Sequence, residues 1–115
     1  MVRAEIRSGK IGADTLSEVV ARLAAALQPV RIYLFGSQAY GEPHDDSDVD
    51  LMVVLPGPVP RVSECYGTAH ASLRGLRVPV ELHFVSAAGF ERRRKTPGSL
   101  DHEVAERGRL DYECR

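Results

Sequence analysis

A glycine–serine pair and two closely spaced aspartates are the residues of this chain whose types and spacing can do chemistry. Gly36 and Ser37 follow a short apolar run, and after ten further residues Asp48 and Asp50 begin a longer one. Side chains on a strand alternate between its faces, so both aspartates are expected to project to one side while Val49 points into a core. Two neighbouring carboxylates repel each other, and proteins commonly hold Mg²⁺ with one or two carboxylates plus the phosphates of a substrate.

The Gly-Ser turn supplies the complementary half of such a site. Gly36 lets the backbone approach a phosphate closely, and Ser37 can add a hydroxyl while backbone N–H groups point at the anion. Either pattern alone is more often an ordinary turn or a solvated loop. Here both adjoin apolar, strand-like segments, which is the context that these motifs require. Together they predict a nucleoside triphosphate bound as its magnesium complex, with Asp48 and Asp50 as metal ligands.

The elements that must position these residues alternate between helices and strands. Thr15 and Glu18 suggest a capping box at the start of a helix that ends before Pro29. Further along, the patterns predict strands over 30–35, 48–55, 78–85 and 109–113, a short helix after Gly36, and helices over 62–73 and 99–108. This alternation predicts an α/β fold in a single small domain over residues 1–115. We expect a mixed β-sheet with helices packed on one face and the site on the other.

Two segments have faces that the sequence assigns in detail. In the helix over 62–73, one face should carry Val62, Cys65, Tyr66, Ala69 and Leu73, with Gly75 just beyond the end. In the strand over 78–85, Glu81 and His83 should share one face and Leu82 and Phe84 the other. His83 could contact a substrate or a phosphate from that face, but a histidine on a strand is more often structural or solvated, so the sequence gives it no definite role.

The motif carries a family resemblance. Residues 36–51, with Gly-Ser, ten residues and Asp-x-Asp between hydrophobic strands, resemble the signature of the minimal nucleotidyltransferase (MNT) domain of the DNA polymerase β-like superfamily. The resemblance extends to residues 78–86 and 96–113 and implies the polymerase β-like nucleotidyltransferase fold. It also implies a third catalytic and metal-binding acid on a neighbouring strand, at Glu81, where the family usually has Asp. Asp48, Asp50 and Glu81 would then hold two Mg²⁺ ions, and Tyr40 stands where Arg is common.

The resemblance implies a magnesium-dependent nucleotidyltransferase. Such an enzyme would move a nucleoside monophosphate, expected to be AMP from ATP although another NTP is open, onto an acceptor hydroxyl. Many minimal members are encoded beside a HEPN protein and act as its antitoxin, so a HEPN-like toxin is the expected partner and acceptor. One alternative is a non-catalytic antitoxin or binding module with a vestigial site, which the departures at Glu81 and Tyr40 motivate. A modifier of small molecules ranks last, because the chain looks too short for a second substrate-binding domain.

Composition sets the remaining expectations. The formal net charge of −1 argues against a globally basic nucleic-acid binder, but leaves local patches open. The basic run 92–95 is expected at a solvated helix end or in a loop, with a contact to phosphate or to an acidic or RNA-bearing partner as the alternative. Cys65 and Cys114 form no zinc or disulfide pattern, and no apolar run is long enough for a bilayer, so a cytoplasmic location is expected. An exposed sheet edge favours a homodimer or a hetero-oligomer.

Overall fold

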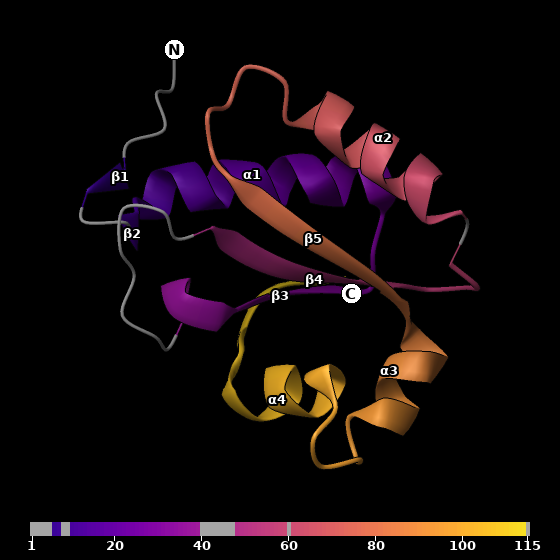
Figure 1. Ribbon diagram of the computed structural model, residues 1–115. Helices are drawn as coiled ribbons and strands as arrows, with labels where there is room; N and C mark the ends of the chain where they lie inside the picture. The colour runs from indigo at the N-terminus through magenta and orange to yellow at the C-terminus, as the bar shows by residue number, and fades with distance from the viewer. Residues whose placement is uncertain (1–5, 8–9, 40–47, 60, 115) are drawn as a thin grey trace.

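A mixed four-stranded sheet forms the centre of the molecule. The computed structural model describes residues 6–7, 10–39, 48–59 and 61–114 (Figure 1). The sheet has the order β5-β4-β3-β6, in which β4 and β5 are parallel and the other neighbours antiparallel. Its strands are β3 (Arg31–Phe35), β4 (Val49–Leu55), β5 (Val80–Ser86) and β6 (Arg109–Glu113). The predicted α/β class, mixed sheet and four strands are therefore confirmed.

Helices cover both faces of this sheet, which corrects the expectation that they lie on one face only. The longer helices α1 (Ala13–Leu27) and α2 (Val62–Ser72) pack on one side, and α3 (Ala87–Arg93) and α4 (Leu100–Arg107) on the other (Figure 1). Each side has its own core, because alternate residues of β3 and β4 point in opposite directions. The side under α1 and α2 includes Leu23, Ile32 and Leu51, and the side under α3 and α4 includes Tyr33, Met52, Phe90 and Val104.

The first helix begins differently from the prediction. Gly12 is the N-cap residue and makes no side-chain capping bond, so the predicted capping box is wrong. Thr15 lies within the first turn and is buried, because it falls on the face that packs against the sheet. Glu18 instead pairs one turn ahead with Arg22, whose Nε lies 2.8 Å from Oε2 of Glu18.

The second helix keeps most of its predicted face. Cys65, Ala69 and Leu73 are buried as expected, and Tyr66 packs against the same core. Val62 is 53% exposed, so its assignment to the buried face is wrong. It is the first residue of α2, and none of the described core clusters reaches it.

The last helix follows the prediction closely, whereas α3 was not predicted. The hydroxyl of Ser99 accepts from the backbone N–H of His102 at the start of α4. Gly108 ends that helix at a place where a Cβ atom would lie 2.6 Å from the carbonyl oxygen of Val104. Ser86 caps α3 in the same manner, and the basic run 92–95 lies at the C-terminal end of this helix, which is one of the two positions that the sequence left open. The two-stranded ribbon of β1 (Ile6–Arg7) and β2 (Lys10–Ile11) was also not predicted.

None of the helices in the described ranges combines the length and the apolar character needed to cross a membrane. Cys65 and Cys114 do not form a disulfide with each other, as expected.

Candidate active site

Three side chains converge where β3 ends and β4 and β5 begin. Asp50 lies opposite Phe35 across the β3–β4 pair and opposite Glu81 across the β4–β5 pair. His83, two residues after Glu81, points to the same face of the sheet. Asp50, Glu81 and His83 each offer one potential ligand atom, and these atoms all lie within 4.8 Å of one another. Asp50 and His83 are half-buried and Glu81 is exposed, so the group is open to solvent on one side.

Gly36 provides the space for Asp50. Its backbone has a φ of 78°, which glycine adopts readily and other residues rarely do. A Cβ atom at this position would lie 2.3 Å from Oδ2 of Asp50, far inside contact distance. Gly36 also begins a short 3-10 helix, η1 (Gly36–Gln38), that turns the chain away from β3. The glycine therefore permits both the turn and the close approach of the carboxylate to the backbone.

Burial and neighbouring acids both raise the pKa of Asp50. Partial burial, a hydrogen bond with Glu81, and the charges on Glu81 and Asp48 together raise the pKa of Asp50 to about 6. Burial is the largest of these causes, and all of them disfavour the ionised form. Two carboxyl groups held this close would both ionise more readily beside a cation, because an opposite charge favours the charged form.

The structure brings together only part of the predicted site. Asp48 is exposed and lies just before β4; it is not in the group with Asp50, Glu81 and His83, although its charge acts on Asp50. The backbone of Ser37 is in η1, but its side chain falls outside the described part of the chain. Tyr40 lies outside the described residues altogether. The ligand roles of Asp48 and Ser37 therefore stay predictions.

His83 is the residue that the sequence analysis left without a role. Its ring stands beside that of Phe35, with centroids 5.3 Å apart and planes tilted by 59°. The signal was its spacing of two from Glu81, which places both side chains on one face. What the sequence lacked was the register of β5 against β4, which sets His83 opposite Met52 and Glu81 opposite Asp50.

The residues of this group fit a divalent metal ion. Two carboxylates and an imidazole are common donors for such ions, and their donor atoms are close enough to share one ion. A cation bound here would favour the ionised form of Asp50, whose pKa is raised by burial first and by the neighbouring acids second.

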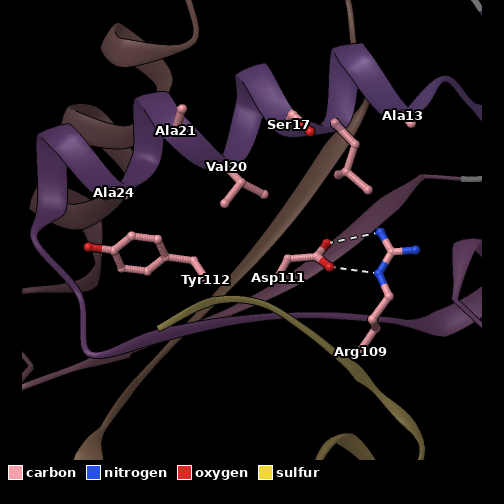
Figure 2. Close-up of a pocket in the computed structure, with 9 residues that line it drawn as sticks. Ala13, Ser17, Val20, Ala21, Ala24, Arg109, Asp111 and Tyr112 are labelled. Carbon is pink, nitrogen blue, oxygen red and sulfur yellow. Dashed lines mark hydrogen bonds and ion pairs between the residues drawn. The ribbon is translucent and has the colours of Figure 1, made fainter. Parts of the chain in front are cut away.

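A separate cavity of about 490 Å³ lies between α1 and β6, on the opposite face of the sheet (Figure 2). Small and apolar side chains of α1, including Ala13, Val20 and Ala24, form one wall. Arg109 and Asp111 on β6 are bonded to each other, with Nε of Arg109 2.6 Å from Oδ1 of Asp111. The charges of Arg109 and Asp111 neutralise each other. The group of Asp50, Glu81 and His83 lies on the other face of the sheet, so this cavity is not the candidate active site.

The sequence profile of the nucleotidyltransferase domain matches residues 14–106, so the chain belongs to the nucleotidyltransferase domain family. The crystal structure of a protein from Sulfolobus solfataricus, to which a nucleotidyltransferase function has been ascribed, superposes with a TM-score of 0.59. That match has 20% sequence identity and covers 87% of this chain and 78% of the other, which shows a common fold. No curated protein matches the sequence.

Proposed function

We propose that this protein is a magnesium-dependent nucleotidyltransferase that moves a nucleoside monophosphate, AMP from ATP, onto an acceptor hydroxyl. The observation that carries the proposal is the convergence of Asp50 and Glu81 beside the Gly36 turn. Membership of the nucleotidyltransferase domain family supports the reaction class.

Each residue has a defined task in this proposal. The turn at Gly36 and Ser37 binds the triphosphate, since its glycine lets the backbone approach an anion. Asp50 and Glu81, together with Asp48, would hold two magnesium ions, which would supply neutralising charge at the triphosphate and activation of the acceptor hydroxyl. Glu81 is the exposed member of the group, so an incoming acceptor can approach from its side. The extra methylene of Glu81, relative to the usual Asp, lengthens its reach across the β4–β5 pair.

The proposed acceptor is a HEPN-like toxin, which the protein would modify and neutralise as its antitoxin in the cytoplasm. Support for the partner comes from the resemblance to minimal nucleotidyltransferases, which are commonly encoded beside HEPN proteins. A neighbouring reading frame for such a protein would supply the acceptor to test. A homodimer or a complex with that partner is the proposed assembly.

Transfer of label from α-³²P-ATP to the purified partner tests the reaction. Wild-type protein should label the partner in the presence of Mg²⁺, while Asp50→Asn should reduce labelling by at least about a hundredfold because a metal ligand is lost. Asp14→Asn is the matched control, since Asp14 is an exposed aspartate in the first turn of α1. Equal labelling by the Asp50→Asn variant and the wild type would reject the proposed site.

A second candidate is neutralisation by binding alone. The observation that favours it is the position of Asp48, which lies outside the described group of potential metal ligands. Neutralisation of the partner by the Asp48→Asn, Asp50→Asn double variant would support this alternative. If a variant still binds the partner but loses both labelling and neutralisation, the catalytic function is favoured.

A further inference from the structure

We infer that His83 is a metal ligand, and that it gives this site a mixed nitrogen–oxygen donor set that favours transition-metal ions over Mg²⁺. The inference rests on the proposed function, because it concerns the same site. It goes further by assigning a role to a residue that neither the motif nor the resemblance includes. Its first support is proximity, since the ring of His83 offers a nitrogen within 4.8 Å of carboxylate oxygens of Asp50 and Glu81.

The backbone aims these three side chains at one place. β4 and β5 are parallel, with Asp50 opposite Glu81 and Met52 opposite His83, so all four side chains lie on one face. Along this face of the sheet, the side chains pass from the buried core to the partly exposed site. Met52 is buried under α3 and α4, whereas Asp50 and His83 are half-buried at the edge of that core. An imidazole at this boundary can reach the carboxylates while its other side packs on protein.

Packing restricts the ring of His83. The ring of Phe35 lies 5.3 Å from the ring of His83, centroid to centroid. Phe35 is buried on β3, where it lies opposite Asp50, and β3 and β5 flank β4 on its two sides. A ligand whose orientation is limited by a neighbour loses less freedom when it binds a metal. Phe35 thus helps to hold the imidazole on the same side as Asp50.

The chemistry of the donors sets the preference. Mg²⁺ takes hard oxygen ligands and loses its waters reluctantly, so an imidazole nitrogen adds little to its affinity. Imidazole suits Zn²⁺, Co²⁺ and Ni²⁺ much better, and carboxylates also bind these ions. The site should therefore bind Mg²⁺ through its carboxylates and bind Co²⁺ with an additional nitrogen ligand. Mn²⁺ binds mainly through the carboxylates and takes the same nitrogen when the imidazole is already in reach. Because most sites prefer transition metals to Mg²⁺ to some degree, the informative quantity is how the preference changes when the nitrogen is removed.

The test measures direct metal binding by isothermal titration calorimetry on the full chain, with Mg²⁺ and Co²⁺ as probes. His83→Asn replaces the nitrogen donor with an amide oxygen and is expected to weaken Co²⁺ binding by at least about tenfold. The same substitution should change the Kd for Mg²⁺ by less than about threefold, because the carboxylates remain. His70→Asn is the matched control, since His70 is an exposed histidine on α2 whose loss should change neither Kd.

A spectroscopic measurement on the wild-type protein does not depend on how the variant folds. Electron spin-echo modulation of bound Mn²⁺ should show coupling to a nitrogen nucleus, and His83→Asn should remove it. Absence of nitrogen coupling in the wild type, or equal loss of Co²⁺ and Mg²⁺ affinity in His83→Asn, would overturn the inference while leaving the nucleotidyltransferase proposal intact. If neither ion binds the wild type and Asp50→Asn labels the partner normally, both proposals fail.

Discussion

A methyl group on Gly36 would lie 2.3 Å from Oδ2 of Asp50, so the carboxylate occupies the space that a larger residue would need. The φ of 78° at Gly36 adds a second reason for glycine, because a side chain in that conformation costs roughly 1–2 kcal/mol. Glycine is therefore required at position 36, the start of the motif, because the carboxylate of Asp50 at its end lies so close.

Gly36→Ala is expected to lower the free energy of unfolding by about 2 kcal/mol and to displace Asp50. Urea denaturation measures the first effect, and the calorimetric Kd for Mn²⁺ measures the second. Gly67→Ala is the control, because Gly67 is exposed in the middle of α2 with open space around its Cβ position. That substitution should stabilise the protein by about 0.5–1 kcal/mol through helix propensity. Unchanged stability and metal affinity in Gly36→Ala would contradict the proposed close packing.

Asp50→Asn should make the metal-free protein more stable at neutral pH. The folded-state pKa of Asp50 is raised to about 6 from its usual 3.8, so the folded protein retains this proton more strongly than the unfolded chain does. Linkage then lowers the stability of the wild type as pH rises from about 4 to about 6, and the loss persists above that range. Asparagine is never ionised and avoids the penalty. After a discount for solvent screening, we expect a gain of about 1 kcal/mol at pH 8.

Thermal unfolding in EDTA at pH 4 and pH 8 checks this prediction. The gain from Asp50→Asn should be present at pH 8 and much smaller at pH 4, where the folded protein keeps the Asp50 proton and the unfolded chain is only partly ionised. Asp14→Asn, at an exposed position, should not reproduce the gain. A variant that is less stable than the wild type at pH 8 would show that repulsion among the carboxylates does not govern this site.

Phe90→Ala tests the core beneath α3 and α4. Phe90 is fully buried and stacks on Tyr33, with ring centroids 5.3 Å apart. Its truncation is expected to cost about 3–5 kcal/mol in the free energy of unfolding. Leu110→Ala is a suitable comparison, because Leu110 is 45% exposed on β6 and should cost far less. Equal effects of the two changes would argue against a second core.

The two cysteines should differ in reactivity. Burial, with a smaller contribution from the charge of Glu64, raises the pKa of the Cys65 thiol, whereas Cys114 is exposed near the C-terminal end. In the Cys114→Ser variant, labelling with a thiol reagent at pH 7.5 should be slow until urea unfolds the chain. Cys65→Ser should be labelled rapidly under native conditions. Fast labelling of Cys65 in the folded protein would indicate that α2 opens readily from the sheet.

The strands and the site motif were predictable because their signals are local. Apolar runs bounded by glycine and proline located β3 and β4, and alternation alone assigned Glu81 and Leu82 to opposite faces correctly. The helix α3 was missed because it has only 7 residues, with one large apolar side chain and two arginines at its end, so it carries no apolar period. Its packing depends on one residue, Phe90, which becomes informative only when the facing core on β3 and β4 is known.

The proximity of His83 to the two carboxylates could not be predicted for a related reason. His83 is ordinary in sequence, and its proximity to Asp50 depends on a parallel register between strands that are separated by α2. No local pattern specifies that register. The capping box was a local pattern that the tertiary structure overrides. Thr15 and Glu18 match the motif, but Thr15 is buried within the first turn and the helix begins after Gly12.

The parallel pairing of β4 with β5 has a thermodynamic consequence. Asp50 and Glu81 are separated by 30 intervening residues, so the unfolded chain holds them apart and cannot chelate an ion with both. An ion that binds only the native register stabilises the fold by the full amount set by its concentration and Kd, about 2.7 kcal/mol at a hundredfold excess over Kd. The melting temperature of the protein should then rise with metal concentration and report how far the site is occupied.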